Sequence, residues 1–513
     1  MVFGFALLGI IVDTAWIMVS HFGSESPIAP ILGLTPTQAA LTAIALLSLL
    51  IWVVLLGFWG NFWRGSERLS TPTNRPTNSP TNRLTNRLTN TPTRTSAPRQ
   101  LSEERESLVS DVPSVIAIVP ARNEAEVLPE TLRSLLSQRY VGRLCILLVD
   151  DGSTDGTGEL AHRLAQTLPH VEIVSEDLST TGTPNPRTEP QGDTAADRRR
   201  PSTQPAIEFA IISPPPLPQG WTGKLWALDR GIAAARAHWG DPDYLWLTDA
   251  DICHTPDNLQ RLVEHARNDR RELVSLMVQL RCESLWERLM VPAFIFFFQK
   301  LYPFPWVNDP EQAMAAAAGG CILLQTQTLD RIGGLSCVRQ ALIDDCALAW
   351  AVKHSEPQEW EAPLNPDPTN PIPHTYRRIW LGLSDTTRSL RPYDSRASLG
   401  EMVARTAYTQ LNYSPWLLLG TIVGMILVYL VPPFSAIGGL AFHLLPLASI
   451  GGLTWGGMVV AYRPTLRSYG QPTLLGVLLP AIATLYLFAT IDSAWRHWRG
   501  DGGAWKGRTY TKH

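Results

Sequence analysis

Residues 143–157, RLCILLVDDGSTDGT, carry an unbroken apolar run that ends in two aspartates followed by glycine, serine and threonine residues. A short apolar run closed by turn-forming residues is typical of a strand that is buried on both faces. The next stretch, DGTGELAHRLAQTL at 155–168, has its apolar residues at helical spacing. The chain is therefore predicted to pass from a strand through a polar loop into a helix.

The same alternation extends on both sides of this stretch. Apolar strands are predicted at 114–120, 171–175, 206–212 and 243–251, and helices at 126–138 and 224–238. Strands that alternate with helices are typical of an open α/β sheet with parallel strands and with helices on its faces. In such sheets ligands bind beyond the carboxyl ends of the strands, and polar motifs stand at those ends in this chain.

Two polar motifs follow the first two strands. VPARNEA (119–125) places Asn123 and Glu124 after the first strand, and VDDGSTDGT (149–157) places Asp150 and Asp151 after the second. A carboxylate there can accept hydrogen bonds from a uracil ring or from ribose hydroxyls, and glycine lets a ligand approach the backbone closely. Asp-Gly-Ser also occurs in ordinary turns, so this motif alone is a weak indication.

Two further motifs can address a diphosphate. GWTGK (220–224) places Lys224 at a helix start, where an ammonium and free N–H groups can meet phosphate, although an ordinary helix-starting loop explains it equally well. TDAD (248–251) places Asp249 and Asp251 two residues apart at a strand end. Magnesium or manganese prefers such oxygen ligands and bridges carboxylates to substrate phosphates, although aspartates also occur in loops by chance.

The segment LIDDCALAWAV (342–352) places Asp344 and Asp345 at the start of an apolar helix. Carboxylates at this position commonly cap a helix, and the motif by itself favours that interpretation. Together with the preceding carboxylate motifs, we interpret it as the general base that deprotonates an acceptor hydroxyl.

The chain also contains apolar runs near both ends. Residues 39–63 are long enough to cross a bilayer, which takes roughly 20 apolar residues. Residues 3–20 are interrupted by an aspartate and predict either another span or an interfacial or buried helix. Residues 415–461 predict two spans broken at Pro432–Pro433, and 472–492 predict one more.

The basic residues predict an orientation for these runs. Residues 21–38 contain no lysine or arginine, whereas Arg64 and Arg68 follow the second run, so the positive-inside rule places the central region in the cytoplasm. A fifth full span would export a tail that is rich in lysine and arginine, against the same rule. Either the last run is re-entrant or interfacial, or the number of spans differs.

Composition excludes several classes of protein. The net charge is −3 and charged residues make up 17% of the chain, which gives no general electrostatic case for nucleic-acid binding. Six cysteines in 513 residues are too few for a disulfide framework, and we interpret them as reduced core residues. The mean hydropathy of −0.01 averages apolar runs with two polar stretches, 64–111 and 176–205, which are predicted to be disordered.

In this order, VPARNEA, VDDGSTDGT, GWTGK, TDAD, AGGC (318–321) and IDD (343–345) resemble a family 2 glycosyltransferase of the GT-A fold. The resemblance covers residues 112–400. GWTGKLWAL, SLRPYDS (389–395) and the stretches at 282–309 and 402–425 are similar to the hopanoid-biosynthesis-associated glycosyltransferases in particular. The resemblance implies an α/β domain with a Rossmann-like mixed sheet, flanked by N- and C-terminal transmembrane helices.

The resemblance also implies a role for each motif residue. The metal ion, Mg²⁺ or Mn²⁺, would bind Asp249 and Asp251, and Asp345 beside Asp344 would provide the catalytic base. Such enzymes invert the anomeric carbon by direct displacement, in which the metal stabilises the departing nucleoside diphosphate. Binding of the nucleotide sugar and lining of its pocket would fall to Asn123, Glu124, Asp150, Asp151, Lys224, Asp249, Gly319 and Gly320.

One segment departs from processive relatives such as cellulose and chitin synthases, which carry a Q/RxxRW motif. The nearest segment is HTYRRIW (374–380), where Ile379 separates Arg378 from Trp380. This difference favours transfer of a single sugar over polymer synthesis. The aromatic stretch 285–306 predicts either a core helix or a membrane-surface element, and the second interpretation suits a lipid acceptor.

These expectations combine into one domain plan and three hypotheses. The plan has two transmembrane helices (1–63), a disordered linker (64–111), a catalytic domain (112–400) and a C-terminal transmembrane region with a basic cytoplasmic tail (401–513). The leading hypothesis is an inner-membrane enzyme that transfers one sugar from a UDP-sugar to a lipid in hopanoid metabolism. The alternatives are transfer to polyprenyl phosphate and a non-catalytic scaffold, which the intact metal-site carboxylates disfavour.

Overall fold

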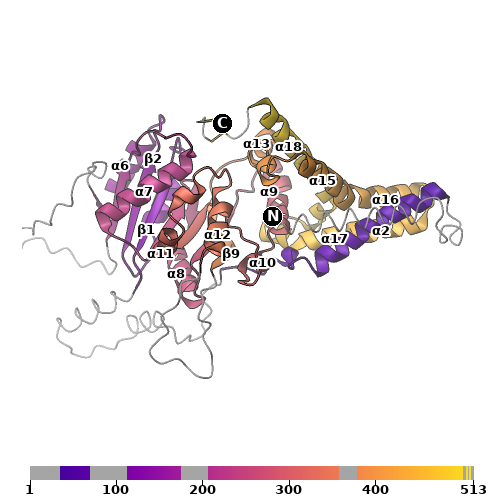
Figure 1. Ribbon diagram of the computed structural model, residues 1–513, viewed down its shortest axis with the longest axis horizontal. Helices are drawn as coiled ribbons and strands as arrows, with labels where there is room; N and C mark the ends of the chain where they lie inside the picture. The colour runs from indigo at the N-terminus through magenta and orange to yellow at the C-terminus, as the bar shows by residue number, and fades with distance from the viewer. Residues whose placement is uncertain are drawn as a thin grey trace, which may run out of the picture. The chain divides into compact units, whose positions relative to one another are not determined.

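The computed structural model (Figure 1) describes residues 35–69, 112–174, 206–356 and 378–500, with the backbone of 504–505 and 508–509. The chain forms two compact units. The membrane unit comprises Met1–Glu67, Leu280–Ala315 and Pro392–His513, and the sheet unit comprises Arg68–Gln279 and Ala316–Arg391. The apolar run at 3–20, residues 70–111 of the first polar stretch and the second polar stretch (176–205) lie outside the described residues.

The sheet unit is built on a mixed sheet, which confirms the predicted α/β class. Its first five strands in spatial order are parallel, and β8, which follows them, is antiparallel to both of its neighbours. β9 is parallel to β7 and antiparallel to β6. Within the described residues the order is β3 (Val171–Ile173), β4 (Ile207–Ile212), β2 (Leu144–Asp150), β1 (Val115–Ala121), β5 (Tyr244–Thr248), β8 (Cys321–Gln325), β7 (Leu273–Gln279), β9 (Ile379–Ser389) and β6 (Ile252–His254).

The register of the strands brings the polar motifs to one edge of the sheet. Ala121 at the end of β1 pairs with Asp150 at the end of β2, so the loops after both strands begin side by side. Thr248 at the end of β5 pairs with Cys321 at the start of the antiparallel β8. The loop before β8 therefore opens at the same edge as the loop after β5.

Helices cover the sheet because their apolar residues recur on one side. In α5 the buried residues include Leu128, Leu132 and Leu135, which follow helical spacing. α7 packs on β1 and β2, and Gly231 lets it approach closely, since a Cβ there would lie 2.7 Å from Val149 Cγ2. The helices of this unit are α5 (Leu128–Leu136), α6 (Thr157–Gln166), α7 (Gly223–Trp239), α8 (Asn258–Asn268), α11 (Thr326–Arg331), η3 (Leu335–Val338) and α12 (Asp344–His354).

The membrane unit is helical. Four of its described helices are long and apolar enough to cross a membrane: Pro36–Gly57, Pro415–Ala441, Leu445–Ser468 and Thr473–Arg499. They contain α2 (Pro36–Gly57), α15 (Pro415–Met425), η4 (Ile426–Leu430), α16 (Val431–Ala441), α17 (Leu445–Ser468), η5 (Thr473–Leu478) and α18 (Leu479–Arg499). The shorter helices are η1 (Phe62–Arg64), α9 (Leu285–Leu301), α10 (Phe304–Asn308), α13 (Arg396–Ala404) and α14 (Ala407–Gln410).

The predicted break at Pro432–Pro433 is wrong. The helix continues from Pro415 to Ala441, because a π-helical segment, η4, precedes the two prolines and places them in the first turn of α16. The N–H groups of a first helical turn have no partner within the helix, so proline costs little there. The chain turns instead at 442–444, where His443 adopts a left-handed φ of 57°.

Side chains of α2 stabilise the π-helical segment. Ser48 Oγ of α2 donates to the Leu427 carbonyl at 2.7 Å, and Trp52 Nε1 donates to the Val428 carbonyl at 2.8 Å. Backbone carbonyls that lose their helical partner must be satisfied in this way where water is excluded. α2, α16 and α17 lie side by side (Figure 1).

Residues 280–315 and 392–400 pack in the membrane unit, although the domain plan assigns them to the catalytic domain. Phe296 of α9 lies 5.1 Å from Tyr462 of α17 between ring centroids, and Phe297 lies 5.0 Å from Tyr486 of α18. Leu399 of α13 is fully buried in the same apolar cluster. The aromatic stretch is thus a core helix of the membrane unit.

Candidate active site

The loops after β1 and β2 interlock at the carboxyl edge of the sheet. Asn123 has a left-handed φ of 51°, and its Oδ1 accepts the Thr154 N–H at 2.8 Å. The Asn123 N–H donates to Ser153 Oγ at 3.0 Å, and the Glu124 N–H donates to Thr157 Oγ1 at 3.0 Å. The two predicted nucleotide motifs therefore form one structure.

The two aspartates of the second motif have different surroundings. Asp150 Oδ1 accepts the Ser153 N–H at 2.9 Å, so this carboxylate closes its own turn. Asp151 is buried, and its Oδ2 lies 3.8 Å from the Arg122 guanidinium. Arg122 also donates to the Asp151 carbonyl. Asp155 accepts from Ala125 N–H at 3.0 Å and further joins the loops, a role that its local sequence did not predict.

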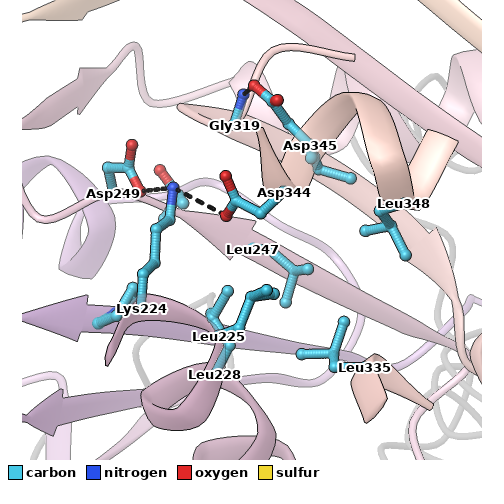
Figure 2. Close-up of a pocket in the computed structure, with 13 residues that line it drawn as sticks. Lys224, Leu225, Leu228, Leu247, Asp249, Gly319, Leu335, Asp344, Asp345 and Leu348 are labelled. Carbon is cyan, nitrogen blue, oxygen red and sulfur yellow. Dashed lines mark hydrogen bonds and ion pairs between the residues drawn. The ribbon is translucent and has the colours of Figure 1, made fainter. Parts of the chain in front are cut away.

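A second cluster surrounds a pocket beside these loops. Figure 2 shows Lys224 of α7 pointing toward Asp249, which follows β5, and toward Asp344 at the start of α12. Lys224 Nζ lies 2.7 Å from Asp249 Oδ1 and 3.8 Å from Asp344 Oδ2. The pocket holds about 350 Å³ of empty space, part of it open to solvent, and its apolar wall includes Leu225, Leu228, Leu247, Leu335 and Leu348.

Lys224 is the cation of this pocket. Burial alone would lower the pKa of its ammonium, but Asp249 and Asp344 outweigh burial and raise the pKa above its ordinary value. The ammonium is therefore charged across the physiological range. A fixed cation at the start of α7, beside the carboxyl ends of the strands, is suited to a diphosphate.

Asp345 is held by two backbone N–H groups. Its Oδ2 accepts from Gly319 at 2.8 Å and its Oδ1 accepts from Cys346 at 2.7 Å. Burial and the neighbouring Asp344 raise the pKa of Asp345 to about 6, although Lys224 opposes the shift. A carboxylate with a pKa near neutrality, fixed at a pocket wall, can accept a proton from a bound hydroxyl.

Gly319 and Gly320, which were both predicted to line the pocket, have different surroundings. Gly319 lines the pocket, and a Cβ there would lie 3.1 Å from Lys224 Nζ and 3.3 Å from Asp345 Oδ2. Gly320 instead faces apolar side chains, since a Cβ there would lie 3.1 Å from Val278 Cγ1. Gly319 thus keeps space between the cation and the carboxylate, whereas Gly320 serves the packing of β8.

Asp251 and Asp249 contact different basic side chains. Its Oδ2 accepts from Arg391 Nε at 2.7 Å, and Arg391 Nη2 donates to Glu124 Oε1 at 2.8 Å. Burial raises the pKa of Asp251, with Asp249 and Glu124 adding to the shift and Arg391 opposing it. Arg391 was missed as a site residue, although it stands in the SLRPYDS segment that carries the resemblance.

Asp249 and Asp251 are the carboxylates that could bind a divalent cation arriving with a diphosphate. Among the described residues no group of three or more His, Cys, Asp and Glu side chains is placed to hold a metal ion. Metal ions that bridge substrate phosphates need only one or two protein carboxylates. Asp249 and Asp251 supply hard oxygen ligands of this kind, and both are held by basic side chains.

Trp380 does not line the pocket, and the cysteines form no disulfide. Trp380, which belongs to the segment nearest the processive motif, is buried in β9 with its ring 4.3 Å from that of His265. It is not among the pocket-lining residues. All six cysteines are free, as predicted, but Cys337 is exposed rather than part of the core.

Two family models match this chain. The glycosyl transferase family 2 model matches residues 116–178, and the glycosyl transferase family 21 model matches residues 202–373. These matches support a glycosyltransferase enzyme. With the mixed sheet, they also confirm the predicted GT-A type of fold.

Characterised relatives match shorter segments. Glycosyltransferase AglE of Haloferax volcanii is 38% identical over 71 residues, which are 14% of this chain and 23% of that protein. The undecaprenyl-phosphate mannosyltransferase of Micrococcus luteus is 29% identical over 153 residues, which are 30% of this chain and 44% of that protein. The chain therefore spans less than half the length of either relative.

Solved structures of glycosyltransferases align at low identity. The mannosyltransferase PcManGT from Pyrobaculum calidifontis, in complex with GDP-Man and Mn²⁺, is 14% identical with a TM-score of 0.40, covering 88% of this chain and 99% of that one. Glucosyl-3-phosphoglycerate synthase from Mycobacterium tuberculosis, with Mn²⁺ and UDP-glucose, is 15% identical with a TM-score of 0.30, covering 63% and 84%.

Proposed function

We propose that this enzyme transfers one sugar from a nucleoside diphosphate sugar, a UDP-sugar in particular, to a lipid hydroxyl with inversion at the anomeric carbon. The observation that carries the proposal is the pocket in which Lys224 faces Asp249 and Asp344, with Asp345 fixed by Gly319. This pocket places a proton acceptor, Asp345, beside a cation that can bind a diphosphate. The family matches supply the class of reaction.

Each group has a separate task in this proposal. The interlocked loops of Asn123 and Asp151 bind the nucleoside, and Lys224 contacts the diphosphate. Asp249 and Asp251 would hold Mg²⁺ or Mn²⁺, which when bound would stabilise the negative charge of the leaving diphosphate. Asp345 takes the proton of the acceptor hydroxyl while the hydroxyl oxygen bonds to the anomeric carbon and the bond from that carbon to the diphosphate breaks.

A lipid acceptor is supported by the helices of the membrane unit, since four of the described helices are long enough to span a bilayer. We place the sheet unit in the cytoplasm of a cell with the helices in its inner membrane, in agreement with Arg64 and Arg68 after α2. The resemblance to hopanoid-associated enzymes favours a hopanoid lipid. Single transfer is supported by the burial of Trp380 away from the pocket.

A polyprenyl phosphate is the second candidate acceptor. It is supported by the 29% identity to the undecaprenyl-phosphate mannosyltransferase. Such an acceptor is already an anion, so its attack on the donor depends less on a general base.

The two acceptors are distinguished by replacing Asp345. Asn keeps an oxygen that can accept the Gly319 N–H but cannot take a proton. For a hydroxyl acceptor, Asp345→Asn should lower kcat by about 100-fold or more, measured as nucleoside diphosphate release by purified protein with Mn²⁺, a donor panel and native lipids. Near-full activity of the variant would favour the phosphate acceptor.

The control variant is Asp330→Asn, which removes an exposed carboxylate paired with Arg236 and should leave kcat unchanged. The acceptor itself is identified by comparing the lipids of a deletion strain with those of the parent. A missing glycolipid would name the sugar and the lipid together. An unchanged lipid profile would count against lipid glycosylation.

A further inference from the structure

The last apolar helix of the membrane unit does not follow the path of a full span. Thr473–Arg499 has the length and composition to cross a bilayer. Its first part, η5, nevertheless runs back along α17: Trp455 Nε1 donates to the Val477 carbonyl at 3.2 Å, and Gly476 packs against Val459. Trp455 and Val459 lie near the middle of α17, so η5 returns only halfway along that helix.

α18 then runs outward again. Tyr486, in the first half of α18, packs on Phe297 of α9, as does Tyr429 of η4, which is the middle of the Pro415–Ala441 helix. Tyr486 Oη also donates to the Met290 carbonyl of α9 at 2.9 Å. Near its end, Ala494 packs with Leu418 at the start of α15. Figure 1 shows α15 and α18 side by side.

The carboxyl end of α18 lies where the chain enters the Pro415–Ala441 helix. Ser493 Oγ accepts the Tyr408 N–H at 3.0 Å, and the His497 ring stacks on Tyr413 at 4.4 Å between centroids. The opposite end of the bundle is the turn between α16 and α17, where the Leu444 N–H donates to the Gly439 carbonyl at 2.7 Å. α18 therefore begins near the middle of the bundle and ends at the entry end, where the chain enters the Pro415–Ala441 helix.

Basic side chains gather at the entry end of the bundle. Arg467 at the end of α17 and Arg496 and Arg499 at the end of α18 stand at the entry end, while the turn at 442–444 contains no lysine or arginine. The positive-inside rule places the basic end in the cytoplasm. A crossing α18 would put its arginines on the opposite side from Arg467.

Three exposed tryptophans lie at the entry end of the bundle. Trp416 at the start of α15 and Trp495 and Trp498 at the end of α18 are 80%, 51% and 55% exposed. Arg499 lies over the Trp495 ring, 5.0 Å from its centroid. Exposed tryptophans beside arginine are typical of the boundary between the hydrocarbon core and the headgroups.

We infer that η5 and α18 form a re-entrant hairpin, which enters the bilayer from the cytoplasmic side, returns to that side, and presents Trp495 and Trp498 to the lipid headgroups beside Trp416 of α15. The described helices then cross the membrane three times, through α2, the Pro415–Ala441 helix and α17. The carboxyl end of α18, with Arg496 and Arg499, stays on the cytoplasmic side. This inference concerns the bilayer and stands or falls separately from the proposed glycosyl transfer.

The test labels one exposed cysteine at a time in the full chain, on intact cells, with a membrane-impermeant maleimide. Phe442→Cys, in the exposed turn after α16, and Arg499→Cys, at the end of α18, are made in a Cys337→Ser background. The native exposed Cys337 marks the side of the sheet unit. The Phe442→Cys variant should react on intact cells, whereas Arg499→Cys and the native chain should react only after permeabilisation.

Equal labelling of the Phe442→Cys and Arg499→Cys variants on intact cells would overturn the hairpin. The reverse pattern would keep the hairpin and overturn the cytoplasmic placement of the sheet unit. As a second measurement, green fluorescent protein or alkaline phosphatase is fused to the end of the full chain. Fluorescence without phosphatase activity is expected. An active phosphatase, in a chain whose native Cys337 reacts only after permeabilisation, would show that α18 crosses.

Discussion

Asp345 combines two features that rarely occur in a simple helix cap. Its carboxylate accepts two backbone N–H groups, which favour the charged form, and yet burial and Asp344 raise its pKa to about 6. The carboxylate is therefore charged at neutral pH and still basic enough to take a proton. A solvent-exposed capping aspartate would stay close to its ordinary pKa.

The pH dependence of the reaction follows from this pKa. Below about pH 6 Asp345 is protonated and cannot accept a proton, so kcat/KM should rise with pH and level off above pH 6. Asp344→Asn removes a charge that raises the pKa of Asp345, so the rising limb should move to lower pH. The measurement is a pH profile of both proteins; a limb that stays in place or moves upward would contradict this electrostatic coupling.

Arg391 holds two carboxylates of the site at once, Asp251 and Glu124. Without it, burial and the nearby Asp249 would raise the pKa of Asp251 further and weaken its hold on a cation. Arg391→Ala should therefore raise the Mn²⁺ concentration for half-maximal activity by about tenfold, the equivalent of roughly 1.4 kcal/mol. Arg391→Lys should recover part of this loss, since lysine keeps the charge but not the two-pronged geometry.

The matched control is Arg388→Ala, which removes an exposed arginine near the end of β9 that pairs with Glu130. It should leave the Mn²⁺ requirement unchanged. If Arg391→Ala lowered kcat without any change in the Mn²⁺ requirement, Arg391 would act in some other way than through Asp251.

At the scale of single elements, local sequence patterns predicted β1, β2, β5, α5 and α7 because each buries a continuous run or one regular face. The same patterns placed the carboxylate motifs at strand ends. They could not report that Arg391 reaches Asp251, 140 positions earlier in the chain. They also misplaced the turn near Pro432, because the hydrogen bonds that stabilise the π-helical segment come from α2.

The close approach of α7 to the sheet depends on Gly231. A Cβ there would lie 2.7 Å from Val149 Cγ2 and 2.9 Å from Ile118 Cγ2, so both side chains would have to shift. Gly231→Ala should destabilise the sheet unit by about 1–3 kcal/mol, seen as a lower Tm in detergent. Gly400→Ala in α13, where a Cβ would meet nothing within 4 Å, is the control and should not lower the Tm. An unchanged Tm for Gly231→Ala would show that α7 can move away freely.

At the scale of the whole molecule, the long apolar helices predict integral attachment to the membrane. The Pro36–Gly57 and Pro415–Ala441 helices contain 18-residue stretches with mean hydropathies of 2.7 and 2.2, and many of the large apolar side chains of these helices are exposed. Alkaline carbonate and high salt, which release proteins held by charge, should therefore leave this protein in the membrane pellet. Release into the supernatant by either treatment would show that the helices do not enter the hydrocarbon core.

The division of the chain into two units bears on how the enzyme can be produced. The sequence passes between the units at Glu67–Arg68, Gln279–Leu280, Ala315–Ala316 and Arg391–Pro392, so neither unit is one continuous piece of sequence. Cutting before Arg68 and after Arg391 would still leave α9 and α10. The buried residues of α9, such as Met290 and Phe296, would lose the neighbours from α2, α17 and α18 that cover them. A soluble catalytic fragment therefore requires replacement of 280–315 by a short polar linker as well as removal of both ends.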